Sequence, residues 1–323
     1  MNTALTTIEP NGLEQIDAGR IEAALTDITL DVLGSRHSRR NYERALAEFW
    51  AWHRANGRPV IRKATLQRYA ADLTGQGMKA GNVNFRLCAI RRMVKEAAEN
   101  GLMNEQDARS AGAVEGVRMS GGSTGVWLSK GQAEAFINSL PRITLANKRD
   151  FAMSCLFLSS GLRRSEMASL TVEHFRQVEG RWVILAIIGK RNKKRDVPIT
   201  GWAKHAVDIW LEAAGITAGP VFRPVNKGDK LAGEKVTPEA IRQAVDRAIN
   251  QANQNGAGLP SIAAHDLRRT FAQLARKGGA PIEQIQLALG HESVKTTEVY
   301  LGKKQDFTNA PCDALGLTIG RAA

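Results

Sequence analysis

Cysteine is scarce in this chain of 323 residues, and the three thiols (Cys88, Cys155 and Cys312) are scattered without CxxC spacing. An odd number of isolated cysteines argues against a disulfide framework and against a zinc site. Scattered thiols of this kind are typical of the reducing cytoplasm, and we expect the protein there.

Long apolar runs are missing as well. No uninterrupted apolar stretch approaches the roughly 18 residues that a membrane-spanning helix needs. The N-terminus also lacks the basic-then-apolar pattern of an export signal. We therefore expect no membrane association. Hydrophobic residues still make up 43% of the chain, which excludes wholesale disorder and allows two domains with their own cores.

Positive charge, by contrast, is abundant. The formal net charge of +13 favours a polyanionic partner, nucleic acid before membrane. The charge is unevenly distributed: residues 1–30 hold one Arg and five acids, whereas residues 31–100 hold fourteen Lys or Arg and six acids. The excess therefore belongs to a segment with helical patterning and not to a polar tail.

The most informative part of the chain opens on an amphipathic helix. Leu267, Phe271 and Leu274 recur at the i, i+4 and i+7 positions of an apolar helix face. His265 and Arg268 lie three residues apart and therefore share another face of the same helix. Taken alone, such a pair is usually an ordinary polar surface.

Two shorter helices are predicted to follow. Pro281 starts the first helix, Gly290 ends it, and His291 lies in the turn. Ser293 can cap the second helix, which carries Tyr300 about two turns in. The pair could instead form a helix-turn-helix, but its second helix lacks the basic face of a recognition helix.

Together, His265, Arg268, His291 and Tyr300 resemble the C-terminal signature of the tyrosine recombinases, the lambda-integrase family that includes Cre and the Xer proteins. The family pattern HxLR, then LGH, then a Tyr nine residues after that His is met without a gap. The resemblance implies a mainly α fold with a small antiparallel β-sheet or hairpin in the catalytic domain, in a two-domain DNA clamp. It also implies that these four residues are catalytic, with Tyr300 as the nucleophile.

An upstream motif beginning at Gly161 extends the resemblance. In the family, the Arg after Gly-Leu is the first catalytic arginine, which selects Arg163 over Arg164, and Glu166 matches a supporting carboxylate. Gly161 is expected to end a helix, so that Arg163 lies at an element boundary. The alternative is an ordinary Arg–Glu pair on a helix.

A hairpin with a basic tip is predicted from two apolar runs, 182–188 and 197–199. In the family, the Lys directly after the Gly of this tip enters the active site, which selects Lys190, with Lys193 as the substitute. The tip holds five basic residues in positions 190–195, and the DNA contacts predicted among them are Arg191, Lys193 and Lys194. Arg191 departs from the family pattern, in which Gly often stands at that position.

The N-terminal half resembles the family's core DNA-binding domain by pattern alone. Thr65 is predicted to cap a short helix there. A longer helix carries a basic stripe that we expect to follow DNA phosphates, made of Arg86, Arg91, Arg92 and Lys95. For each single arginine, a solvated helix face is the alternative.

These patterns predict five segments along the chain. They are a mobile or weakly helical segment (1–34), a helical core DNA-binding domain (35–109), a Gly-rich linker (110–126), the catalytic domain (127–302) and a C-terminal tail (303–323). The tail either folds back on its own domain or docks on a neighbouring protomer.

The resemblance implies a site-specific recombinase that cuts and rejoins DNA through a 3′-phosphotyrosyl bond and exchanges strands through a Holliday junction. It implies no metal, no other cofactor and no ATP, and the sequence offers no carboxylate cluster suited to Mg²⁺. Expected partners are double-stranded recombination sites, a homotetramer on two sites, and accessory DNA-bending or directionality proteins. The free protein is expected to be a monomer or weak oligomer, cytoplasmic and nucleoid-associated.

Two other functions stay open at this stage. A type IB topoisomerase-like nicking-closing enzyme would share the constellation, but would act as a monomer and rejoin the parental strands. A catalytically silent architectural protein would bind DNA without forming covalent adducts.

Overall fold

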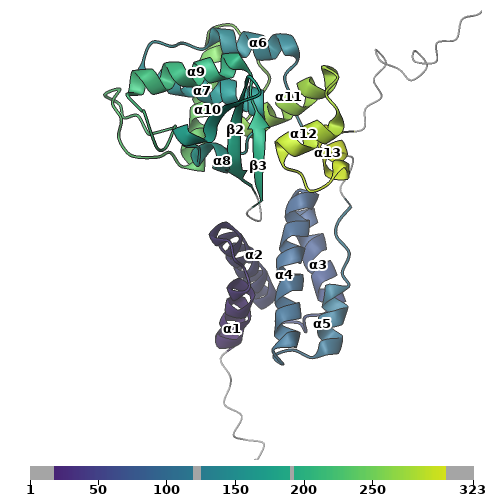
Figure 1. Ribbon diagram of the computed structural model, residues 1–323. Coiled ribbons are helices and arrows are strands. Elements are labelled where there is room, and N and C mark those ends of the chain that lie inside the picture. The colour runs from purple at the N-terminus through teal and green to yellow at the C-terminus, as the bar shows by residue number, and fades with distance from the viewer. Residues whose placement is uncertain (1–17, 119–124, 190–192, 303–323) are drawn as a thin grey trace, which may run out of the picture. The chain divides into compact units, whose positions relative to one another are not determined.

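The computed structural model describes residues 18–118, 125–189 and 193–302. The chain forms two compact units, residues 1–122 and 123–323 (Figure 1). Within the described residues no helix is long and apolar enough to cross a membrane.

The first unit is helical in its described part. Its helices are α1 (Ala18–Asp31), α2 (Arg36–Ala55), α3 (Lys63–Gly75), α4 (Ala80–Glu99) and α5 (Glu105–Gly112). Their apolar faces form one core, in which Leu46, Phe49, Tyr69 and Ile90 are almost completely buried. Leu25 on α1 belongs to the same core. The N-terminal helix is therefore an integral element, where the sequence indicated only weak helicity.

One local prediction in this unit was wrong. Thr65 does not cap α3, because the helix already begins at Lys63; the Thr65 hydroxyl instead donates a hydrogen bond to the Val60 carbonyl at 2.5 Å. Helix α5 continues to Gly112, three residues into the predicted linker, whose bounds stay a prediction.

The second unit packs helices around a small sheet. Its helices are α6 (Lys130–Ser139), α7 (Leu145–Ser160), α8 (Arg164–Ala168), α9 (Gly201–Ala214), α10 (Pro238–Gln254), α11 (Ala264–Lys277), α12 (Ile282–Leu289) and α13 (Val294–Leu301), with a 3₁₀ turn, η1, at Val172–His174. Helix α7 is buried along nearly its whole length and contacts α9, α10 and α11. It is the central helix of this unit, as expected of a helix surrounded by other elements.

The sheet is antiparallel, with strand order β1 (Phe175–Val178), β2 (Arg181–Ile188), β3 (Lys194–Pro198). The predicted hairpin is formed by β2 and β3, whereas β1 was not predicted. The register shifts between Ile184 and Ile187, and bulges of this kind bend a strand near its end. The predicted fold class, mainly α with a small antiparallel sheet, is confirmed, while the two-domain clamp stays a prediction.

The last three helices have a small core of their own, formed by Ala272, Ile285, Leu289 and Leu301. The predicted limits of α12 and the predicted start of α13 are confirmed. Gly290 ends α12 in the left-handed conformation, and the Ser293 side chain caps α13 by accepting a hydrogen bond from the Thr296 amide. These two caps fix where His291 and Tyr300 lie.

Candidate active site

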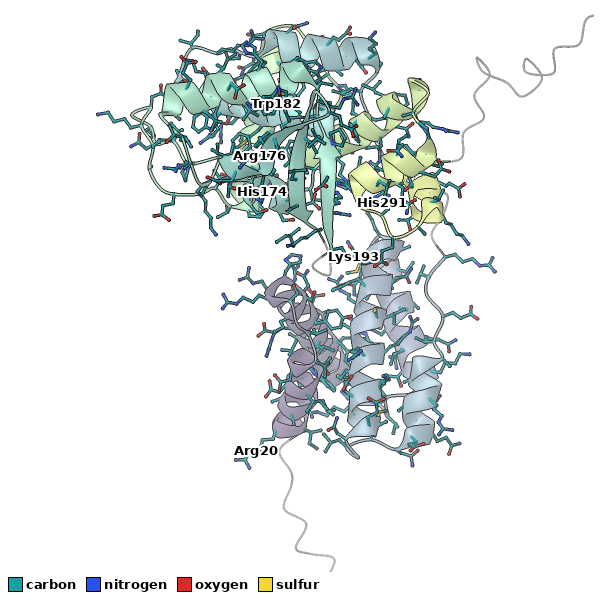
Figure 2. All side chains as sticks on the ribbon, viewed as in Figure 1. Arg20, His174, Arg176, Trp182, Lys193 and His291 are labelled. Carbon is teal, nitrogen blue, oxygen red and sulfur yellow. The ribbon has the colours of Figure 1, made fainter. Side chains whose placement is uncertain are left out.

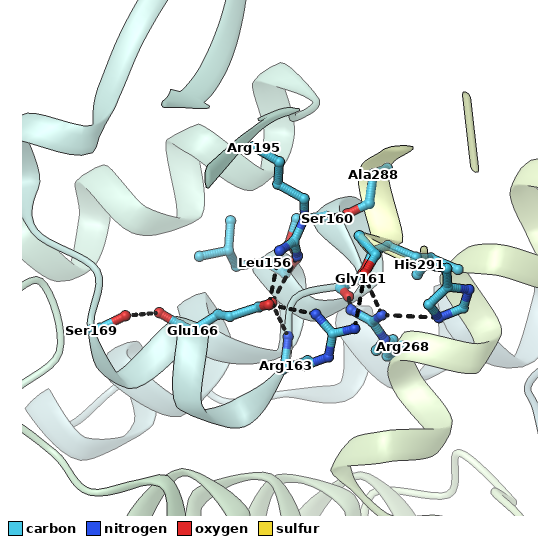
Figure 3. Close-up of polar contacts among 12 residues, drawn as sticks. Leu156, Ser160, Gly161, Arg163, Glu166, Ser169, Arg195, Arg268, Ala288 and His291 are labelled. Carbon is cyan, nitrogen blue, oxygen red and sulfur yellow. Dashed lines mark hydrogen bonds and ion pairs between the residues drawn. The ribbon is translucent and has the colours of Figure 1, made fainter. Parts of the chain in front are cut away.

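Arg163 lies at the junction between α7 and α8, as predicted. Gly161 ends α7 in the left-handed conformation, and Arg163 is the N-cap of α8. The Arg163 guanidinium donates to Glu166 Oε1 at 2.7 Å and to the Gly290 carbonyl at 3.3 Å (Figure 3). Arg164, the residue that the motif did not select, is exposed and forms a long ion pair of 3.9 Å with Glu239.

Arg268 is deeply buried, with 2% of its surface exposed. Its guanidinium donates to the Leu289 carbonyl at 2.6 Å and also to the Gly161 carbonyl. Burial, together with the nearby Arg163, lowers the pKa of Arg268 to about 10. The group therefore stays positively charged at neutral pH.

His291 is held between a donor and a hydroxyl. Arg268 can only donate, so it is the Nε2 atom of His291 that accepts, at 3.4 Å. The ring proton then lies on Nδ1, which donates to Thr297 Oγ1 at 3.0 Å. Burial and the charges of Arg268 and Arg163 lower the pKa of His291 to about 4, so the ring is neutral.

Tyr300 contacts both imidazoles. Its ring centroid lies 5.8 Å from that of His265 and 5.2 Å from that of His291, each in an edge-on arrangement, and the Arg269 guanidinium lies over the ring at 5.2 Å. Among the described residues, the buried Tyr300 hydroxyl has no hydrogen-bond partner of regular geometry. Burial raises the pKa of Tyr300, although the charge of Arg268 acts in the opposite direction. The phenol is thus protonated and needs a base to become a nucleophile.

His265 is placed to act on this phenol. It lies in the first turn of α11, and its side chain keeps an exposed edge. Packing of the rest of the ring, followed by the charges of Arg268 and Arg269, lowers the pKa of His265 below its ordinary 6.5. A neutral imidazole can accept a proton, which is what a general base requires.

Glu166 is buried and connects two arginines, the predicted Arg163 and the unpredicted Arg195. The Arg163 backbone amide donates to Glu166 Oε2 at 2.7 Å, and Arg195 donates to both carboxylate oxygens at 2.8 Å. Burial alone would raise the pKa of Glu166, but these hydrogen bonds outweigh it and hold the pKa at about 2. The carboxylate is therefore ionised at neutral pH.

Sequence reasoning missed Arg195 because it was counted among the cations of the hairpin tip. A usable signal was present. Arg195 and Val197 are two residues apart on a strand and so face the same side, and Val197 is completely buried. An arginine on the inward face of a strand needs a carboxylate partner, which here is Glu166.

The rest of the hairpin tip is only partly described. Lys190 and Arg191 lie outside the described residues. Lys193 lies at the end of the hairpin (Figure 2), exposed, with its ammonium 3.8 Å from the Glu292 carboxylate. Lys194 is exposed at the start of β3. The roles of these four cations stay predictions.

The predicted basic stripe of the first unit is engaged in contacts within that unit. Each of its cations has a partner: Arg86 pairs with Glu48 at 2.5 Å, Arg91 donates to the Val114 carbonyl at 2.5 Å, Arg92 pairs with Glu96 at 2.7 Å and Lys95 pairs with Glu99 at 3.2 Å. Phosphate binding by these side chains would have to compete with those contacts, and it stays a prediction.

Among the described residues, no group of three or more His, Cys, Asp or Glu side chains is arranged to hold a metal ion. The charged groups near Tyr300 are instead mainly cationic: Arg268 and Arg269 act on it together with Asp266, and Arg163 lies close to Arg268. An anion is the kind of ligand that such a site would attract.

The chain is similar to several known proteins. The tyrosine recombinase XerD of Rhizobium meliloti (strain 1021) is 28% identical over 295 residues, covering 89% of this chain and 92% of the relative. Among solved structures, the XerH site-specific recombinase bound to difH substrate, a pre-cleavage complex, has a TM-score of 0.64 at 19% identity and covers 91% of this chain and 83% of that one.

A second solved structure shows the same fold. The Tn1549 transposon integrase in complex with circular intermediate DNA has a TM-score of 0.68 at 14% identity, covering 88% of this chain and 96% of that one. A model of the phage integrase family matches residues 126–306, which is more than half of the 323 residues. The chain therefore belongs to the phage integrase family, the tyrosine recombinases.

Proposed function

We propose that this protein is a site-specific recombinase in which Tyr300 cleaves DNA and becomes covalently attached to it. The observation that carries the proposal is the convergence of the Tyr300 ring with His265, His291 and Arg268 in one site. These residues come from α11, the turn after α12, and α13. A phenol, two imidazoles and a buried guanidinium are the groups that metal-free transfer of a phosphodiester requires.

The chemical step is an in-line attack by the Tyr300 oxygen on the scissile phosphorus. A bond forms between that oxygen and phosphorus while the bond to the 5′ oxygen breaks. Negative charge grows on the non-bridging oxygens, and planar guanidiniums complement it, which assigns this role to Arg163 and Arg268. The result is a 3′-phosphotyrosyl bond and a free 5′ hydroxyl.

Two proton transfers accompany this attack. His265 takes the phenolic proton, because the pKa of Tyr300 is raised by burial and the free phenolate is therefore rare. Lys190 donates a proton to the leaving 5′ oxygen, with Lys193 as the substitute. His291 hydrogen-bonds the phosphate. In the free protein its Nε2 atom accepts a hydrogen bond from Arg268, so Nε2 must gain a proton before it can donate to a phosphate oxygen.

The covalent bond conserves the energy of the broken one, so a 5′ hydroxyl from a partner duplex can reverse the step without ATP. Strand exchange then proceeds through a Holliday junction, with four protomers on two recombination sites. The free protein is a monomer or weak oligomer, and accessory DNA-bending or directionality proteins assist it. We place the protein in the cytoplasm, on the nucleoid. The net charge of +13 supports a DNA partner.

Strand exchange separates this proposal from a nicking-closing enzyme of the topoisomerase IB type. Two duplexes carrying the recombination site, each with a different fluorescent label, are incubated with the protein. A recombinase yields recombinant duplexes in which both labels are present on one molecule. A nicking-closing enzyme returns only parental duplexes, and that result would overturn the proposal. Family membership favours exchange.

A further inference from the structure

The C-terminal end of α12, with its C-cap Gly290, is held by three arginines from three separate elements (Figure 3). Its last carbonyls each accept a hydrogen bond from a different one: Ala288 from Arg195 at 2.9 Å, Leu289 from Arg268 at 2.6 Å and Gly290 from Arg163 at 3.3 Å. Carbonyls at a helix C-terminus have no partner within the helix and carry partial negative charge, so cations are favourable there. His291 follows Gly290 directly.

Arg195 is the member of this group that no catalytic pattern selected, and all of its nitrogens are engaged. Nε donates to Ala288, while the two terminal nitrogens donate to the two oxygens of Glu166. Its side chain is only 11% exposed. An arginine with three protein acceptors and so little exposed surface is not available as a phosphate contact, unlike the exposed Lys193 and Lys194.

Two glycines make room for this guanidinium. A Cβ at Gly290 would lie 3.0 Å from the Arg195 Nη1 atom, and a Cβ at Gly189 would lie 3.2 Å from the same atom. Gly189 also closes the base of the hairpin, since its amide donates to the Lys193 carbonyl at 2.8 Å. Gly189 at the base of the hairpin and Gly290 at the end of α12 therefore both pack against Arg195.

We propose that Arg195 is a positioning residue for DNA cleavage: it joins the base of the β2–β3 hairpin to Glu166 and to the turn that carries His291. Through Glu166 it fixes the guanidinium of Arg163, which shares the same carboxylate oxygen. The described base of the hairpin is thereby fixed relative to Arg163 and to the turn that carries His291. This inference rests on the proposed function.

The test separates DNA affinity from the rate of cleavage. Full-length wild type and Arg195→Gln are compared on nicked suicide duplexes that carry the recombination site, recovered from DNA flanking the coding sequence. Affinity is measured by gel shift, and the rate of covalent adduct formation is measured at saturating protein. Arg195→Gln is expected to bind within about threefold of wild type and to cleave about 100-fold more slowly, the loss that a misplacement of about 1 Å can cause.

A matched control is Arg242→Gln, which removes a partly exposed arginine on α10 that pairs with Glu239 and Asp246. It should cleave at the wild-type rate. If Arg195→Gln does not fold, as judged by its thermal unfolding, Arg195→Lys carries the measurement. An ammonium lacks the fork that serves Glu166 and Ala288 together, so this variant should still be slowed by about tenfold. Cleavage at the wild-type rate by either folded variant would overturn the inference.

The double variant Glu166→Gln/Arg195→Gln tests whether Arg195 acts through Glu166. The fold-decreases in cleavage rate caused by the two substitutions should not multiply. The double variant should cleave about as slowly as the slower single variant. Effects that multiply would mean that Arg195 acts independently, which would overturn the inference. A wild-type chain that forms no adduct at all would instead overturn the proposed function.

Discussion

The ionised state of Glu166 offers a prediction about stability that does not depend on DNA. Glu166 is 2% exposed and receives hydrogen bonds from Arg195 and Arg163. These bonds outweigh the effect of burial and bring the pKa of Glu166 from its ordinary 4.5 to about 2. At about 1.4 kcal/mol per pKa unit, this difference corresponds to about 3 kcal/mol of folding free energy.

The sign of the effect follows from the direction of the shift. A carboxyl whose pKa is lower in the folded state stabilises the protein at pH values above its unfolded pKa. For Glu166, that contribution is complete above about pH 5 and is lost as the pH falls from 4.5 toward 2. Glu166→Gln, which cannot ionise, has no such contribution to lose.

Urea unfolding of the full chain and of Glu166→Gln between pH 7 and pH 3 measures this difference. Between pH 7 and pH 3, the free energy of unfolding of wild type should fall by about 2 kcal/mol more than that of Glu166→Gln. The control is Glu239→Gln, which removes a carboxylate that also pairs with an arginine but is exposed, and the gap between its free energy of unfolding and that of wild type should change far less. A gap between wild type and Glu166→Gln that is constant with pH would refute the reasoning.

Three further predictions concern the site itself. In the DNA-free protein, NMR titration should find the His291 ring neutral down to about pH 4 and His265 titrating below 6.5; normal titration of His291 would contradict its burial beside arginine. Lys190→Ala should slow cleavage by about 10²–10⁴-fold, and a substrate with a 5′-bridging sulfur, which leaves without an acid, should restore the rate of this variant. If that substrate restores the rate of Lys193→Ala instead, Lys193 is the acid. Gly290→Ala should lower the free energy of unfolding by about 1–2 kcal/mol in urea titrations, because its φ of 64° strains residues with a Cβ; an unchanged value would refute this.

The sequence predicted the elements of the site better than it predicted the contacts between them. Gly161 and Gly290 each end a helix one or two residues before a candidate catalytic residue, so the positions of Arg163 and His291 could be inferred from local signals alone. Local helix signals failed at Thr65, because the chain continued the helix one turn upstream of the residue best suited to cap it.

Long-range pairing could not be predicted in the same way. Arg86 looked like one cation of a free basic face, but it pairs with Glu48, which lies on a different helix of the first unit. Arg195 looked like one of five basic tip residues, yet it is the partner of the buried Glu166. In both cases, the sequence shows the charge, while the packing of distant segments decides which acid neutralises it.

The most direct test of this account is to identify the residue that becomes attached to DNA. Wild type is trapped on a nicked suicide duplex, the adduct is digested with protease, and the DNA-linked peptide is mapped by mass spectrometry. We expect the 3′ phosphate on Tyr300, and no adduct from Tyr300→Phe at unchanged DNA affinity. Attachment through another residue, or an adduct that persists in Tyr300→Phe, would contradict the account.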